Sequence, residues 1–167
     1  MEYWDIYDKD KKLTGRTMER NDWNMADGDY HLTVLGAVKR PDGKFLITQR
    51  KLNKQWAPGA WEVSGGGVSA GESSREAVFR EVSEEVGLDL RQALSGGYVF
   101  TYRRDNSQEH NNYFVDVYCY EMNITEADVC LQASETEDFR FATVEEIKAL
   151  ADQGMFLHYD SIRQIFE

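Results

Sequence analysis

Apolar and polar residues alternate through much of this chain, which is the period of β-strands. Runs that alternate, or that are rich in β-branched and aromatic residues, occur at residues 2–8, 16–19, 30–39, 44–49, 61–64, 97–102, 113–121 and 136–141. Turn-forming residues separate them, among them Pro41-Asp42-Gly43, which is typical of a hairpin. We therefore expect these runs to form strands, with residues 2–19 as a first hairpin.

One segment has the period of a helix. Valines recur at every fourth position from Val78 to Val86, so they form one stripe. Ser73 and Glu76 have the spacing of a capping box, and Gly87 lies where a glycine ends a helix. The sequence therefore predicts a short helix whose two ends are both encoded, opened by a turn at the glycines before it.

Two further helices are expected near the end of the chain, at residues 144–152 with Thr143 as N-cap and at residues 160–166. Mixed strands with two or three helices predict an α/β (α+β) fold, arranged as a sandwich. We see no internal repeat and no linker, so residues 1–167 are expected to form a single domain. Residues 1–28 are expected to be an N-terminal hairpin extension of it.

Composition narrows the class of protein. The 167 residues are 41% hydrophobic, which is typical of a globular domain. No run approaches the length that crosses a membrane, and the first residues lack a signal-peptide pattern, so we expect a cytoplasmic protein with no membrane contact. A net charge of −11 argues against binding to a nucleic acid polymer. It does not exclude nucleotides, because bound divalent cations invert the local field.

The helix carries three carboxylates close together. Glu81, Glu84 and Glu85 fall within an arc of about 100° on one face. Like charges at this spacing destabilise a helix unless a counter-charge is present. Oxygen ligands favour hard cations such as Mg²⁺ or Mn²⁺, so this face is a candidate metal site. The alternative is an exposed charged face with no ligand.

These residues belong to a longer pattern. Residues 66–88 resemble the Nudix box, in which glycine, glutamate and an R-E-U-x-E-E-x-G-U segment (U apolar) have set spacings. All nine defined positions match, at Gly66, Glu72, Arg80, Glu81, Val82, Glu84, Glu85, Gly87 and Leu88. The resemblance implies a Nudix-type α/β/α sandwich with a mixed sheet. It also implies Mg²⁺- or Mn²⁺-dependent hydrolysis of a nucleoside diphosphate linked to another group, X.

The rest of the chain resembles the isopentenyl-diphosphate isomerase-like Nudix proteins. True isomerases carry Cys-Gly-His where this chain has Gly65-Gly66-Gly67, although His31 matches another of their metal-binding histidines. Glycine cannot move a proton to or from carbon, so hydrolysis is favoured over isomerisation. A Nudix fold kept as a non-catalytic, nucleotide-sensing or partner-binding module is the third alternative.

The resemblance also implies roles within the box. Glu81 and Glu85 are the first candidates for metal ligands, followed by Glu84 and the carbonyl group of Gly66. Arg80 and Glu72 are expected to position the other residues. From the helix geometry, Arg80 could pair with Glu84 or Glu76, each four positions away.

Many Nudix enzymes take a further glutamate from a later loop as a general base or an extra ligand. In the segment E-T-E-D-F-R-F, this analogy nominates Glu135 and then Glu137. Acidic loop residues are common in so acidic a chain, so solvated side chains are the competing interpretation.

Three residues are candidates for binding a small nucleotide or other diphosphate substrate. His31 could contact substrate or metal, although a hydrogen-bonded structural histidine is favoured. Arg50 could hold a phosphate or brace the box through a glutamate. Trp56 could stack on a base or belong to the core. The N-terminal extension could also pair with a second chain to form a homodimer.

Overall fold

The computed structural model describes residues 1–167. Its strands are β1 (Tyr3–Tyr7), β2 (Leu13–Glu19), β3 (His31–Lys39), β4 (Phe45–Arg50), β5 (Trp61–Glu62), β6 (Ser64–Gly67), β7 (Ser95–Arg104), β8 (Tyr113–Glu121) and β9 (Thr136–Ala142). Its helices are α1 (Ser74–Val86), α2 (Val144–Asp152) and α3 (Tyr159–Ile162). Four 3₁₀ turns complete it: η1 (Leu90–Gln92), η2 (Ser107–Glu109), η3 (Glu126–Asp128) and η4 (Arg163–Phe166). The predicted strands and helices are all present.

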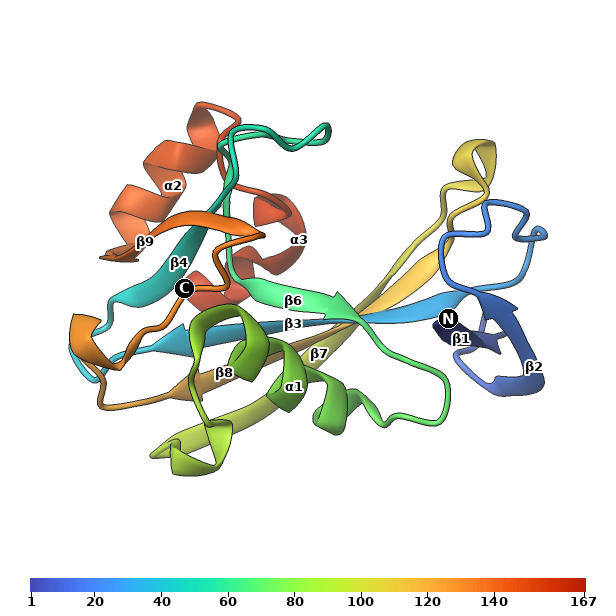
Figure 1. Cartoon of the computed structure of the whole chain (residues 1–167), viewed down its shortest axis with the longest axis horizontal. Coiled ribbons are helices and arrows are strands. Elements are labelled where there is room, and N and C mark those ends of the chain that lie inside the picture. Colours follow the sequence, from blue (N-terminus) through green and yellow to red (C-terminus); the bar gives the residue numbers. More distant parts are fainter.

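Seven strands form a mixed sheet (Figure 1). They run in the order β5-β4-β3-β8-β7, with β6 beside β3 and β9 beside β4. The pair β3–β8 is parallel, and the other pairs of this sheet are antiparallel. Strands β1 and β2 form a separate two-stranded sheet, which Figure 1 shows at one end of the molecule.

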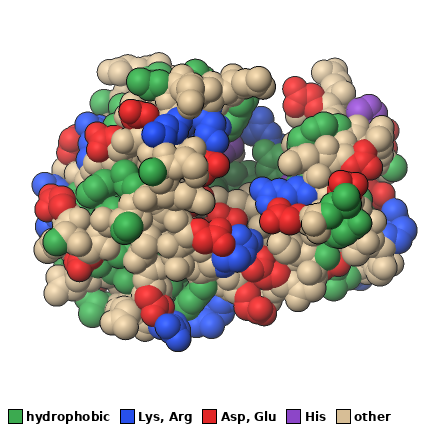
Figure 2. Space-filling view, viewed as in Figure 1, with side chains coloured by type: hydrophobic (Ala, Val, Ile, Leu, Met, Phe, Trp, Pro, Cys, Tyr) green, Lys and Arg blue, Asp and Glu red, His purple; other side chains and the backbone are tan.

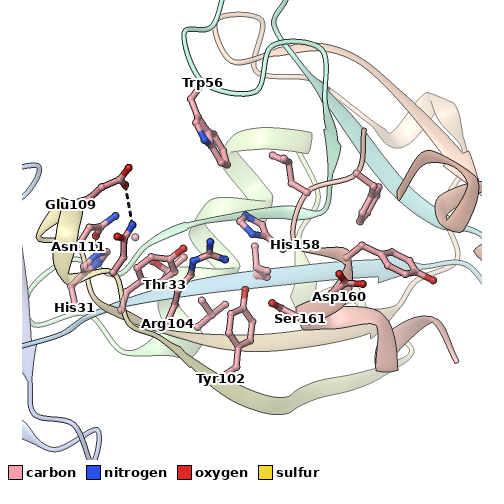
Figure 3. Close-up of a pocket in the computed structure, with 18 of the residues that line it drawn as sticks. His31, Thr33, Trp56, Tyr102, Arg104, Glu109, Asn111, His158, Asp160 and Ser161 are labelled. Carbon is pink, nitrogen blue, oxygen red and sulfur yellow. Dashed lines mark hydrogen bonds between the residues drawn. The ribbon is translucent and has the colours of Figure 1, made fainter. Parts of the chain in front are cut away.

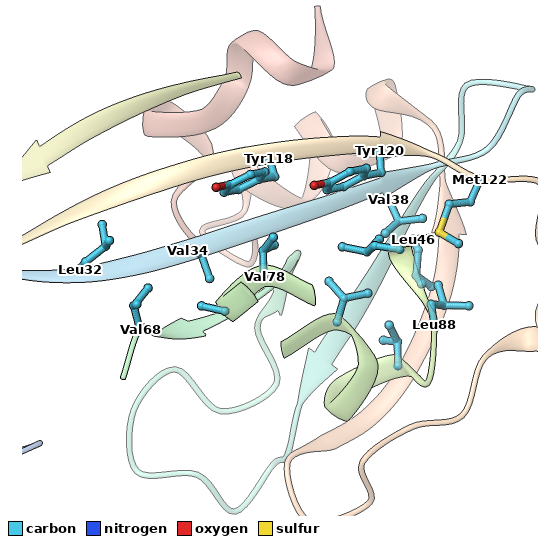
Figure 4. Packing of buried hydrophobic residues seen from close by; sticks show 14 of the residues in the cluster. Leu32, Val34, Val38, Leu46, Val68, Val78, Leu88, Tyr118, Tyr120 and Met122 are labelled. Atoms are coloured by element: carbon cyan, nitrogen blue, oxygen red, sulfur yellow. The ribbon is translucent and has the colours of Figure 1, made fainter. Parts of the chain in front are cut away.

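Alternation along β3 divides the core into two layers. Leu32 and Val34 face α1, where they join one buried cluster (Figure 4). Leu35 and Ala37 face the other way and pack in a second cluster with residues of α2, α3 and η4. The sheet therefore lies between helices on both faces, which confirms the expected α/β/α sandwich.

Close packing of α1 depends on a glycine of β3. A Cβ atom added to Gly36 would lie 2.6 Å from Cγ2 of Val78 and 3.1 Å from Cγ2 of Val82. Helix α1 begins at Ser73, whose side chain accepts the backbone N–H of Glu76, but Glu76 does not return the bond of a full capping box. The helix ends at Gly87, as predicted, and Gly87 has a φ of +72°.

The three glycines before the box helix are not a turn. Residues 64–67 form β6, in which Gly66 lies opposite Val34 of β3. A Cβ atom at Gly65 would collide with the carbonyl oxygen of Val34, so the missing side chains let this short strand approach β3 closely. The expected turn is therefore wrong, and the chain reverses later, between Val68 and Ser73.

An ion pair with a buried carboxylate fixes the N-terminal hairpin to the sheet. Nζ of Lys11, in the turn between β1 and β2, lies 2.7 Å from Oδ1 of Asp116 on β8. Asp116 is only 3% exposed. Tyr7 and Tyr30 also pair through their backbones, so the hairpin is held at two points.

Candidate active site

The first box glutamate lies against the short strand β6. Glu81 on α1 is buried, and its carboxylate occupies the space that a Cβ atom at Gly66 would need. Burial raises the pKa of Glu81, while the neighbouring Arg80 opposes this shift. Glycine at position 66 therefore leaves room for an acidic group beside the backbone.

Glu85 lies one turn further along α1 and faces strand β5. The side chain of Ser64 and the backbone of Gly65 favour its ionised form and oppose a rise in its pKa. The pKa of Glu85 is raised well above its usual value by burial first, and then by the charges of Glu62 and Glu81. Three carboxylates thus influence one another around the edge of β6.

Glu62 is the member of this group that the sequence analysis missed. Burial raises its pKa, and Arg50, whose Nη1 lies 3.5 Å from Oε2 of Glu62, opposes the shift. Glu62 stands outside the box pattern. The only sequence signal for it is its position in a short strand, two residues before Ser64.

Arg80 organises the acidic residues around it. Its guanidinium pairs with both oxygens of Glu72 at 2.8 and 2.9 Å, and with Oε1 of Glu81 at 2.8 Å. It also donates to the carbonyl oxygen of Gly67 at 3.0 Å. Glu84 is half exposed and lies 3.4 Å from Arg80, whereas Glu76 makes no ion pair with it. One of the two alternative pairings is therefore present.

The oxygen groups at this edge fit a divalent cation. Glu81 is buried and Glu85 is partly buried, both next to the backbone of Gly65 and Gly66, and Glu85 has no ion-pair partner within 4.0 Å. Hard cations favour such oxygen donors. No group of three or more His, Cys, Asp or Glu side chains is already arranged as a metal cage, and Glu84 lies 3.4 Å from Arg80. Glu81, Glu85 and the Gly66 carbonyl group could hold the ion.

A large cavity lies on the opposite side of β6 from α1. Its volume is about 1120 Å³, and strands β3, β7 and β8 line it together with the N-terminal segment, the 51–60 loop and residues 156–163. Figure 2 shows the molecule hollowed between the part with the hairpin and the rest. Gly67 also lines the cavity, so it adjoins the box. Ligand pockets usually measure about 300–1,000 Å³, which makes this one large enough for a nucleotide.

Trp56 lines this cavity, and Arg50 contacts Trp56. Trp56 is 59% exposed and lines the cavity, so it is not a core residue. The guanidinium of Arg50 lies 5.0 Å from the centre of the indole ring, and its Nε donates to the carbonyl oxygen of Trp56 at 3.2 Å. Arg50 thus connects Glu62 to Trp56.

His31 lies deeper in the cavity wall and is buried. Its ring stacks on Trp4 with the centres 3.7 Å apart, and its Nε2 lies 2.9 Å from Oδ1 of Asn111. Burial, opposed by that hydrogen bond, lowers its pKa to about 4. The ring is therefore neutral at pH 7 and has the contacts of a structural histidine.

The two loop glutamates are close to basic residues of the 51–60 loop. Glu135 pairs with Lys54 and is half exposed, and its charge raises the pKa of Glu62. Glu137 lies 3.8 Å from Lys51. Of the two, Glu135 is therefore the one that acts on the carboxylates at the edge of β6.

Comparison with known proteins identifies the family. A model of the NUDIX domain matches residues 29–164. The chain belongs to the Nudix family. An uncharacterized Nudix hydrolase of Listeria monocytogenes is 34% identical over 167 residues, which cover 99% of this chain and 94% of that protein. A CTP pyrophosphohydrolase of Escherichia coli is 40% identical over 76 residues, covering 46% and 53% of the two chains.

A solved structure shows the same fold. The Nudix chain superposes on DR0079 from Deinococcus radiodurans with a TM-score of 0.74 and 21% identity, over 92% of this chain and 91% of that one. The family and its relatives make the protein a Nudix hydrolase. The family match begins at residue 29, so the hairpin lies outside it. Membership of the isomerase-like branch stays a prediction, and none of the helices is long and apolar enough to span a membrane.

Proposed function

We propose that this Nudix hydrolase uses Mg²⁺ or Mn²⁺ to cleave the diphosphate linkage of a nucleoside diphosphate joined to another group, X. The observation that carries the proposal is a pair of carboxylates, the buried Glu81 and the partly buried Glu85, at the backbone of Gly65 and Gly66 beside a nucleotide-sized cavity. Two acidic groups so placed repel each other unless a cation is bound. Burying them is consistent with a site built for a metal ion.

Each nearby residue has a defined task in this proposal. Glu81, Glu85 and the Gly66 carbonyl group bind the ion, and Glu84 can join them by turning away from Arg80. When bound, the ion neutralises the charge of the diphosphate and lowers the pKa of the attacking water. Arg80 is a positioning residue, because its guanidinium holds Glu81 directly.

A general base must accept the proton of that water. Glu135 is the candidate among the loop glutamates, because its charge reaches Glu62 at the edge of β6. Its ion pair with Lys54 would have to open for this role. Glu137 remains the second choice.

The cavity supplies the binding side of the proposal. Trp56 offers an exposed indole for a nucleobase. The Nε of Arg50 donates a hydrogen bond to the carbonyl oxygen of Trp56 and so helps to position it. His31 shapes the cavity wall. The name of the Escherichia coli relative, a CTP pyrophosphohydrolase, supports a nucleotide as substrate.

The geometry argues against isomerase chemistry. Gly65 and Gly67 stand where the isomerases carry cysteine and histidine, and a side chain at Gly65 would collide with the backbone of β3. A non-catalytic module is also disfavoured, because the box residues are complete and Arg80 is fully engaged with them.

A substrate panel with matched variants tests the proposal. Nucleoside triphosphates, nucleoside diphosphate sugars and dinucleoside polyphosphates are incubated with Mg²⁺, with Mn²⁺ and with a chelator, and the released phosphorus products are identified. We expect turnover of at least one class only with metal, and its loss in Glu85→Gln. Glu76→Gln, an exposed change on the same helix, is the control and should retain activity. Absence of turnover of every class with either metal would contradict the proposal.

A further inference from the structure

Two aromatic rings of the cavity lining lie near each other. Trp56 comes from the 51–60 loop and His158 from the residue before α3 (Figure 3). Their ring centres are 6.3 Å apart and their planes differ by 29°. They are therefore nearly parallel, with their centres within the range of an aromatic pair.

The separation of the two ring centres falls about 1 Å short of what a third ring between them needs. Carbon atoms in contact lie about 3.5–4.0 Å apart, so a planar ring held between two others needs about 7–8 Å. A movement of about 1 Å in the 51–60 loop would open this space. Trp56 is well exposed on that loop, and its contacts with Arg50 are the ones that such a movement has to carry along or break.

His158 is suited to lie against a base. Burial first, and then the positive charges of Arg104 and Arg50, lower its pKa, so the ring is uncharged at pH 7. Its residue has φ +64°, which directs the chain into α3. A neutral, half-buried imidazole offers a flat face without repelling the donor groups of a base.

Arg104 lies beside these rings and has no acidic partner. It lines the cavity at the end of β7, and no carboxylate lies within 4.0 Å of its guanidinium, although the chain has a net charge of −11. Figure 3 shows its guanidinium pointing into the cavity near His158. The preceding residue of the strand is different: Arg103 pairs with Asp105 at 3.1 Å and does not line the cavity.

We propose that Trp56 and His158 hold the nucleobase between them while Arg104 donates hydrogen bonds to the edge of the base, so that guanine nucleotides are preferred over adenine nucleotides. This inference rests on the proposed function only in taking the ligand to be a nucleotide. Arginine has only hydrogen-bond donors. Guanine presents two neighbouring acceptors, O6 and N7, to such a fork, whereas adenine places an amino donor in the position of O6.

Binding of GDP and ADP, measured by calorimetry, tests the inference without requiring turnover. We expect the wild-type protein to bind GDP about tenfold or more tightly than ADP. Arg104→Gln should lose or reverse this preference, because glutamine pairs with N6 and N7 of adenine. Arg103→Gln is the matched control, one residue away on the same strand, and should keep it.

The stacking part has its own variants. Trp56→Leu should weaken the binding of both nucleotides by about fivefold or more, and Trp56→Phe should restore most of it. If hydrolysis also occurs, Trp56→Leu should raise KM and leave kcat unchanged. A wild-type preference below twofold, or one that Arg104→Gln leaves unchanged, would overturn the assignment of Arg104. Unaltered binding in Trp56→Leu would overturn the sandwich. Hydrolysis can fail while the base preference holds, so the two proposals fail separately.

Discussion

Arg80 and Glu72 form a two-point ion pair that joins the start of the Nudix box to its helix. Nε of Arg80 donates to Oε2 of Glu72 at 2.8 Å, and Nη2 donates to Oε1 at 2.9 Å. Oε1 also accepts the backbone N–H of Ser69 at 3.1 Å. The pairing lowers the pKa of Glu72. Since the same guanidinium contacts Glu81, the loop and the candidate metal ligand are positioned together.

Arg80→Lys should separate positioning from charge. Lysine keeps the positive charge but cannot make the forked contact, so Glu81 loses its fixed orientation. We expect kcat to fall by about tenfold or more and the metal concentration for half-maximal activity to rise. Arg75→Lys, on the exposed side of α1, is the control. Equal metal dependence in Arg80→Lys and the wild-type protein would argue against the positioning role.

Gly66→Ala tests the close approach of Glu81 to β6. The added methyl group would occupy the space of the Glu81 carboxylate and displace it. A displacement of about 1 Å at a reacting centre can cost about 100-fold in rate, so activity should fall by that order. Steady-state kinetics measure the loss, and circular dichroism checks the fold. Full activity in the folded variant would remove Glu81 from the candidate ligands.

Glu85→Gln should make the metal-free protein more stable. The pKa of Glu85 is higher in the folded protein than in the unfolded chain. The free energy of unfolding therefore decreases as the pH rises above the pKa of the unfolded chain and Glu85 ionises. Glutamine removes this cost. In chelator at pH 8 we expect a higher Tm for the variant. Added Mg²⁺ should raise the Tm of the wild-type protein and not that of Glu85→Gln, and the opposite pattern would contradict a metal role for Glu85.

Lys11→Met tests how the hairpin is attached. The change leaves the buried carboxylate of Asp116 without its cation but with the hydrogen bond from Thr101, which costs about 1–3 kcal/mol. Urea unfolding should show a decrease of this order. Lys12→Met, an exposed change at the next residue, is the control. The double variant Lys11→Met/Asp116→Asn should recover part of the loss, and equal losses in the single and double variants would rule out the ion pair as its cause.

His31 should make stability depend on pH between about 6.5 and 4. Its folded pKa of about 4 lies below the ordinary value of 6.5, so the unfolded chain takes up the proton first as the pH falls. The stabilisation is complete above pH 6.5 and is lost toward pH 4, by up to about 3 kcal/mol. His31→Phe keeps a ring against Trp4 and should flatten this part of the urea-unfolding curve against pH. Equal slopes in both proteins would contradict the assignment.

Much of the fold could be read from local patterns. The alternation of residues 30–39 predicts β3, the valine stripe predicts α1, and Gly87 predicts where α1 ends. The box pattern predicts the family, and the absent cysteine and histidine beside Gly66 predict hydrolysis rather than isomerisation. These features are local, because the period of a strand or helix and the conformation of a glycine depend on a few neighbouring residues.

The tertiary structure alone decided which charged groups share the site. Glu81, Glu84 and Glu85 have similar places on a helical wheel, yet packing against β6 buries Glu81, partly buries Glu85 and leaves Glu84 half exposed. Glu62 joins Glu85 because β5 and β6 lie beside the box helix.

The same holds for the cavity. Trp56, Arg104 and His158 come from a loop, a strand end and the start of a short helix, and about a hundred residues separate the first from the last. No local period relates residues so far apart. The register of β3 against β6 and β8, and the packing of the C-terminal helices on the sheet, bring them together.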